Sequence, residues 1–126
     1  MSVSKQWIGR WIDVLDAQDR AVTEKSLAPD ILVLAYHEGV GGPQTRLEGL
    51  EAVFHWLTRA PKGCFIFECL TGSIGGDAPE LPEGELTIKG QYKVSVVDDD
   101  FTNTGEWTLV IRGELIVGVL HEPQPI

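Results

Sequence analysis

Apolar side chains near the amino terminus recur at every third or fourth position within residues 4–18. They are Trp7, Ile8, Trp11, Ile12 and Leu15. This spacing puts them on one side of an α-helix, which we therefore expect to pack against a core. Asp19 can cap a second, shorter helix that runs to Lys25. Pro29 ends that segment, because the proline ring disfavours helical backbone in the residue before it.

The next two segments predict a strand and a third helix. Residues 31–36 form an apolar, β-branched run that precedes a glycine-rich turn at residues 39–43, which is typical of a buried strand. Residues 48–59 carry an apolar stripe that predicts a helix, which Pro61 and Gly63 end. The stripe consists of Leu50, Val53, Phe54 and Leu57.

The remainder of the chain predicts sheet. Candidate strands cover residues 64–73, 85–97, 102–112 and 114–121, and clusters of Gly, Pro and Asp separate them. Alternation is clearest in the second of these strands, whose apolar face carries Leu86, Ile88, Tyr92, Val94 and Val96. Gly90 interrupts that apolar row, and we expect a bend or a close backbone approach there.

The bulk properties fit one domain over residues 1–126, since 43% of the residues are hydrophobic and 23% are charged. The net charge of −9 leaves no basic stripe, so we expect neither a nucleic-acid partner nor a membrane partner. We expect a cytoplasmic protein, because the first residues lack the apolar core of a signal peptide. Cys64 and Cys69 alternate to opposite faces of one predicted strand, which favours two buried thiols over a mutual disulfide.

This order of elements resembles the nuclear transport factor two-like superfamily from end to end. Residues 15–19 (LDAQD) and 27–31 (LAPDI) look like its two-helix entry into the first strand, and residues 46–53 (RLEGLEAV) look like the glycine turn that starts its third helix. The resemblance implies an α+β, cystatin-like fold, in which a cone-shaped, strongly curved antiparallel sheet holds three helices from the N-terminal half in its concave face. It also implies a ligand cavity in the cone and a homodimer formed through the sheet.

Ketosteroid isomerases, scytalone dehydratases, limonene-type epoxide hydrolases and SnoaL-type polyketide cyclases share this fold. In the isomerases a carboxylate near the end of the first strand is the general base, and a Tyr and a protonated Asp polarise the substrate carbonyl. Here that stretch reads Tyr36-His37-Glu38, so the expected Asp is absent. The resemblance implies His37 or Glu38 as the base, with Tyr36 or a protonated Glu68 donating to the developing oxyanion.

Each of these catalytic candidates has a structural alternative. His37 and Glu38 equally fit the rim of a strand end with no chemical task. Glu68 is the one charge within the apolar residues 64–70. It is therefore paired, protonated in the cavity, or pointing outward to solvent or an interface, because an ionised, unpaired carboxylate is costly to bury.

The candidates for ligand binding are aromatic residues and two histidines. The aromatic residues, which either line the cavity or fill the core, are Trp11, Trp56, Tyr92 and Trp107. His55 stands beside the stripe of the third helix, where it covers the cavity mouth or packs at its edge. His121 closes the last predicted strand, so it either completes an acid–base pair across the cone or lies at an exposed strand end. The histidine spacing predicts no metal site, and no glycine motif predicts a nucleotide cofactor.

We therefore expect a pocket protein for a small hydrophobic molecule. The favoured function is a cofactor-independent isomerase, lyase or hydrolase that uses acid–base chemistry. The alternatives are a non-catalytic small-molecule binding protein and a protein–protein assembly module of the same fold. A cavity plugged by the protein's own side chains would favour the assembly module.

Overall fold

The computed structural model describes residues 2–36, 43–59 and 61–123. Its helices are α1 (Val3–Ala17), α2 (Arg20–Ser26) and α3 (Leu50–Leu57). Its strands are β1 (Leu27–Tyr36), β2 (Pro43–Glu48), β3 (Phe65–Ile74), β4 (Leu86–Val96), β5 (Thr102–Arg112) and β6 (Leu115–Pro123). None of the helices in the described part of the chain is both long enough and apolar enough to cross a membrane.

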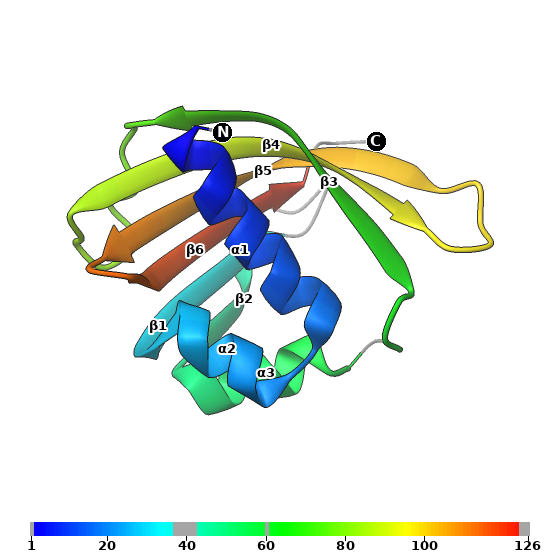
Figure 1. Cartoon of the computed structure of the whole chain (residues 1–126), viewed down its shortest axis with the longest axis horizontal. Helices are drawn as coiled ribbons and strands as arrows, with labels where there is room; N and C mark the ends of the chain where they lie inside the picture. The colour runs from blue at the N-terminus through cyan, green and yellow to red at the C-terminus, as the bar shows by residue number, and fades with distance from the viewer. Residues whose placement is uncertain (1, 37–42, 60, 124–126) are drawn as a thin grey trace.

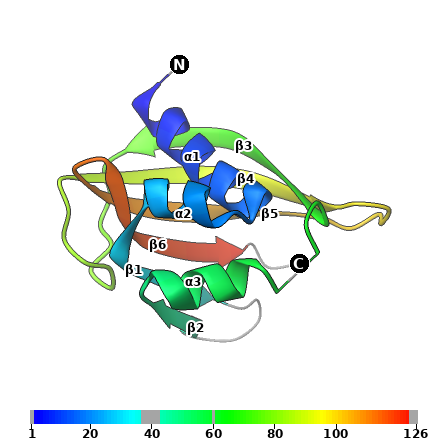
Figure 2. The same ribbon diagram turned by 60° about the horizontal axis from the view of Figure 1, so that its bottom comes forward.

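The strands form one curved sheet in the order β2-β1-β6-β5-β4-β3. All three helices lie on one face of it, with α1 crossing β3 and β4 and with α3 near β1 and β2 (Figures 1 and 2). This arrangement confirms the expected α+β fold with helices in a concave sheet. The sheet is mixed rather than wholly antiparallel, because the last strand, β6, runs parallel to β1, while the other neighbouring strands are antiparallel.

Most element boundaries agree with the sequence pattern. The carboxylate of Asp19 accepts a hydrogen bond from Ala21 N at 2.8 Å, which confirms it as the cap of α2. The main differences are the start of β1 at Leu27 and the unpredicted strand β2. Pro29 is tolerated inside β1 because the pairing with β6 shifts between Leu27 and Leu32, where its missing N–H leaves no ladder bond unmade.

The helix α1 packs closely on the sheet because two glycines face each other beneath it. Gly72 of β3 is the register partner of Gly90 of β4. A methyl group added at Gly90 would overlap the fully buried side chain of Ile8, and one added at Gly72 would lie 3.0 Å from Oγ of Ser4. The close approach predicted at Gly90 is thus the seat of α1.

The opposite face of the sheet carries a second, smaller hydrophobic cluster. Leu81, in the connection between β3 and β4, is buried there with Leu34 and Val117, among others. A methyl group at Gly118 of β6 would lie 3.1 Å from Cβ of Leu81 and 3.2 Å from Cδ of Pro82. The connection therefore packs tightly over the sheet, which helps to fix the strands whose other face carries the site described next.

Candidate functional site

A cavity of about 540 Å³ lies on the helix-covered side of the molecule. Most of its lining comes from the end of α1, from α3 and the residues after it, and from β3, β4 and β6 (Figure 1). The lining residues are Leu15, Gln18, Thr45, Trp56, Leu57, Arg59, Phe65, Phe67, Tyr92, Val94 and His121. The lining is therefore mainly apolar, with a few polar groups, as is usual for sites that bind small molecules.

Four rings, one from each of four adjacent strands, form a continuous row along the sheet beside the cavity. They are Phe67 of β3, Tyr92 of β4, Trp107 of β5 and His121 of β6. Tyr92 stacks on Trp107 with ring centroids 4.1 Å apart and an angle of 13° between the planes. Phe67 packs 5.6 Å from Trp107 on one side, and His121 lies 6.3 Å from it on the other. This packing holds the Tyr92 and His121 rings in fixed positions.

Tyr92 and His121 are joined by a hydrogen bond between Oη and Nε2. Both residues line the cavity, and Tyr92 is only 2% exposed. Burial raises the pKa of the Tyr92 phenol, because the charged phenolate loses its hydration there. The phenol therefore remains protonated at neutral pH and can donate a hydrogen bond.

Gly105 provides the space that Tyr92 occupies. It is the register partner of Tyr92 across β4 and β5. A methyl group at this position would overlap Oη and the ring of Tyr92. The ring cannot simply retreat, because Trp107 stacks against it. The absence of a side chain at Gly105 thus allows the phenol to lie flat on β5 and reach His121.

The polar groups of the lining come from three separate segments. Gln18 is the C-cap of α1 and has left-handed backbone with φ 45° and ψ 43°, a conformation that glycine usually occupies at this position. Thr45 belongs to β2, and Arg59 follows the C-cap of α3, Thr58. These segments therefore contribute a glutamine, a threonine and an arginine to the lining of one cavity.

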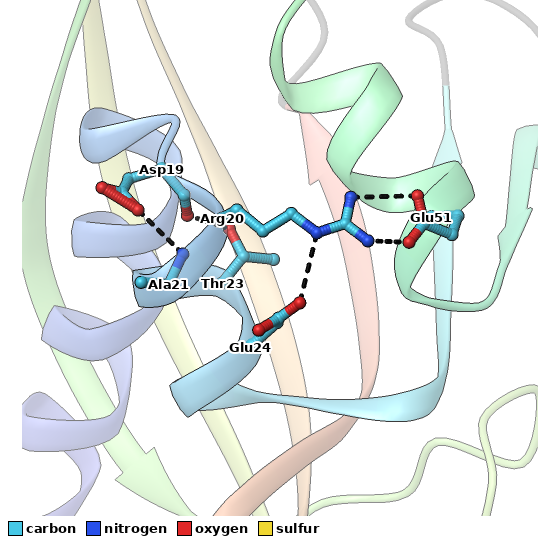
Figure 3. Close-up of polar contacts among 6 residues, drawn as sticks. All are labelled: Asp19, Arg20, Ala21, Thr23, Glu24 and Glu51. Carbon is cyan, nitrogen blue, oxygen red and sulfur yellow. Dashed lines mark hydrogen bonds and ion pairs between the residues drawn. The ribbon is translucent and has the colours of Figure 1, made fainter.

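An ion-pair network holds α3, which carries Trp56 and Leu57, beside α2. Arg20 of α2 lies between Glu24 and Glu51, with its Nε 3.2 Å from Glu24 Oε1 and its Nη1 3.0 Å from Glu51 Oε2 (Figure 3). A second nitrogen of Arg20 also pairs with Glu51, so the contact with α3 is bidentate. Because all three side chains are exposed, the network orients the two helices more than it stabilises them.

The structure brings some of the predicted ligand-binding residues together and separates others. Trp56, Tyr92 and His121 line the cavity, and Trp107 lies directly behind Tyr92. His121 is half-buried within β6, which continues to Pro123, so the alternative of an exposed strand end is wrong.

Trp11 and His55 lie outside the cavity lining. Trp11 is 1% exposed and belongs to the main core, so core filling is its role. Its indole nitrogen has no hydrogen-bond partner among the described residues. His55 is exposed on α3, because the apolar stripe of that helix turns Val53 and Leu57 inward instead.

The predicted catalytic residues have different outcomes. His37 and Glu38 lie outside the described residues, and of Tyr36 the structure describes the backbone, which ends β1. Glu68 is exposed on β3, whereas its neighbour Phe67 faces the cavity. Alternation along the strand therefore turns Glu68 away, which excludes the cavity acid and leaves the outward orientation.

Sequence reasoning named only Trp56, Tyr92 and His121 of the lining and missed the other eight residues, among them Arg59, Phe65 and Phe67. The phenylalanines carried a signal, since a strand that alternates places residues 65 and 67 on the same face. Arg59 carried none, because a cation that follows a helix is common at the protein surface.

Neither cysteine belongs to the described lining of the cavity. Cys64 and Cys69 are free thiols that are partly exposed, so the expectation of two fully buried thiols is wrong, although no disulfide joins them. Burial raises the pKa of Cys69, more than the nearby Lys5 lowers it, which favours the protonated thiol. No group of metal-ligating side chains is present in residues 2–36, 43–59 and 61–123.

Solved structures with the same architecture identify the fold of this chain. A "putative isomerase of the SnoaL-like family" from Agrobacterium tumefaciens superposes with a TM-score of 0.72 and 12% identity, covering 98% of this chain and 99% of the other. The chain has the nuclear transport factor two-like fold. A "putative polyketide cyclase" from Sinorhizobium meliloti has a TM-score of 0.67 and 20% identity, covering 93% and 94% of the two chains.

A "putative ketosteroid isomerase" from Kribbella flavida is similar over 98% of this chain and 81% of its own, with a TM-score of 0.67 and 13% identity. At the level of sequence, no protein-family model and no curated protein matches. The comparisons therefore confirm the nuclear transport factor two-like fold that the sequence pattern resembles, and the chemistry has to be argued from the cavity.

Proposed function

We propose that this protein binds a small, mostly apolar carbonyl compound and transfers protons on it with Tyr92 and His121, without a cofactor. The observation that carries the proposal is the hydrogen bond between Tyr92 Oη and His121 Nε2 in the wall of an otherwise largely apolar cavity. An acid and a base in contact, partly shielded from water, are the minimum equipment for general acid–base catalysis.

The size and lining of the cavity support a small-molecule ligand. Its volume of about 540 Å³ lies within the range of about 300–1,000 Å³ that is typical of ligand sites. Phe65, Phe67 and Trp56 offer flat apolar surface to a ring or a short chain. Because the side chains that the structure describes leave this cavity open, these features favour a ligand-binding protein over a pure assembly module.

The two polar groups have complementary roles in the proposed reaction. A ligand carbonyl oxygen accepts the Tyr92 hydrogen bond in place of Nε2 of His121, so that this nitrogen can act as a base. Nε2 then takes a proton from the carbon next to the carbonyl. The C–H electron pair forms the enolate, whose oxygen Tyr92 stabilises, and the imidazolium returns a proton to the same carbon or, where the enolate is conjugated with a C=C bond, to the far end of that bond.

Deuterium exchange tests this reaction without knowledge of the natural substrate. In D₂O with α-tetralone as the probe, we expect the wild type to speed the loss of the proton next to the carbonyl, followed by NMR. His121→Asn should remove the acceleration, and Tyr92→Phe should lower it about 100-fold, the usual cost of losing one oxyanion donor. A wild type no faster than His121→Asn would refute proton transfer, and α-tetralone binding without exchange would identify a non-catalytic binding protein.

A substitution at Gly105 tests the proposed roles of Tyr92 and His121 without removing either side chain. We expect Gly105→Ala to displace the Tyr92 ring and so reduce exchange, while Tyr92 and His121 are both still present. Gly113 lies in a left-handed turn with open space around it, so Gly113→Asn is the matched control, because Asn tolerates this backbone. Equal exchange in the wild type and Gly105→Ala would show that the position of the phenol does not matter.

We also propose that the protein forms the homodimer expected from its resemblance. The face of β3 that points away from the helices exposes Ile66, at 58%, and Leu70, at 41%. Replacing both residues with Lys should turn a dimer into a monomer in sedimentation experiments. A wild-type protein that sediments as a monomer would end this proposal.

A further inference from the structure

Arg59 is the one formally charged side chain among the described residues that line the cavity, apart from any charge on His121. No carboxylate belongs to the described lining. The whole chain carries 19 acidic against 10 basic residues and a net charge of −9. The cavity thus has the opposite charge character to the protein around it.

The guanidinium group of Arg59 has no partner of opposite charge within the described residues. Other arginines of this acidic protein do pair, as Arg20 does with Glu51 and Arg46 with Glu48. An arginine has up to five N–H donors in a planar fork that matches a carboxylate. Arg59 is therefore available for an anionic group that comes from outside the chain.

The surroundings of Arg59 indicate which kind of anion fits. Its backbone N–H donates to the carbonyl of Trp56 at 3.3 Å, so the residue is tied to the end of α3 beside two apolar lining side chains, Trp56 and Leu57. Phe67 and its register partner Val94 add apolar surface to the same lining, and the Phe67 ring lies 6.2 Å from that of Tyr92. A ligand with one anionic end and an apolar body would match this order of groups.

Gln18 adds an observation that is independent of charge. It lines the cavity from a left-handed backbone conformation that is unfavourable for a non-glycine residue. Glycine would fill this helix-end position without that cost, but it would not place an amide in the cavity. Together with the hydroxyl of Thr45, the amide extends the polar part of the lining beyond Arg59.

We infer that the ligand of this cavity is a monocarboxylic acid, whose carboxylate binds Arg59 and whose apolar body extends along Phe67 and Val94 to Tyr92. This inference deepens the proposed function and rests on it. The substrate class is then a keto acid with a ring or a branched chain between its carbonyl and its carboxylate. Because Arg59 is exposed and screened by water, its charge should strengthen binding by about tenfold.

One charged and one neutral version of the same probe test the inference. We expect β-naphthoic acid to bind the wild type about tenfold more tightly than β-naphthamide at neutral pH, measured by calorimetry. Arg59→Gln should remove this preference while leaving the affinity for the amide unchanged. Arg59→Lys should restore part of it, since the charge returns without the planar fork.

Lys62 offers a matched control for the loss of charge. It is exposed three residues after Arg59 and does not belong to the lining, so Lys62→Gln changes the net charge equally. We expect this variant to keep the full preference for the acid. Equal loss in both variants would assign the effect to overall charge and overturn the inference.

Two further outcomes separate this inference from the function on which it rests. Equal binding of acid and amide to the wild type, together with exchange of α-tetralone, would overturn the carboxylate site and leave proton transfer standing. If Arg59→Gln lowered only the melting temperature, the arginine would have a structural role at the end of α3, and the inference would be wrong.

Discussion

The concave side of the sheet has two regions that are filled to different degrees. Under the first half of α1, Ile8 lies in a seat formed by Gly72 and Gly90, and nothing separates helix from sheet. Around the end of α1, the side chains instead leave the cavity of about 540 Å³. We call these the seated region and the open region.

Both regions use a glycine to admit a larger group, yet with different results. At Gly90 the group is Ile8, which completes the core. At Gly105 it is Tyr92, whose hydroxyl reaches His121 at the cavity wall. The comparison teaches that a glycine can make room for an apolar side chain that completes the core or for a polar side chain that reaches the cavity wall.

The largest expected difference between the regions comes from two tryptophans. Trp11 is 1% exposed in the core, so Trp11→Ala should lower the free energy of unfolding by about 3–5 kcal/mol. Trp56 lines the open region and is half-buried, so Trp56→Ala should cost only about 1–2 kcal/mol. Urea unfolding measures both values. Equal losses would show that the open region is packed as tightly as the seated one.

A smaller effect tests the seat of α1. Gly90→Ala should cost about 1–3 kcal/mol, because the new methyl group meets the buried end of Ile8. Adding Ile8→Val removes that end, so the double variant should be more stable than Gly90→Ala. Both variants should catalyse deuterium exchange on α-tetralone at the wild-type rate. A double variant less stable than Gly90→Ala would mean that the helix does not rest on this contact.

The smallest effect is a pH dependence that belongs to the open region. Burial raises the pKa of Tyr92 above its ordinary value of 10.0, so the native state keeps a proton that the unfolded chain releases. The contribution to stability is complete below pH 10 and falls as the pH rises further, by at most about 1.4 kcal/mol per pH unit. Tyr92→Phe should lack this component when urea unfolding of the two proteins is compared above pH 10. Parallel curves for both proteins would contradict it.

Much of the fold followed from short-range pattern. The spacing of Trp7, Ile8 and Trp11 predicted α1, and the alternation around Tyr92 predicted β4, because helical and extended backbones repeat with different periods. The carboxylate of Asp19 predicted the start of α2 for a local reason as well, since a cap bonds to the next turn. The strand β2 escaped notice because the polar residues around Thr45 carry no such period.

The tertiary structure alone decided which side chains meet. Tyr92 and His121 are 29 residues apart and come together because β5 lies between their strands and Gly105 leaves room for the phenol. Leu81 belongs to a segment with no strand pattern, yet it is buried against a face whose shape the whole sheet defines. The sequence by itself determined the helices, most of the strands and the acidic character of the chain, because these depend on neighbours along the backbone. The site depends on register and curvature, which exist only once the sheet has formed.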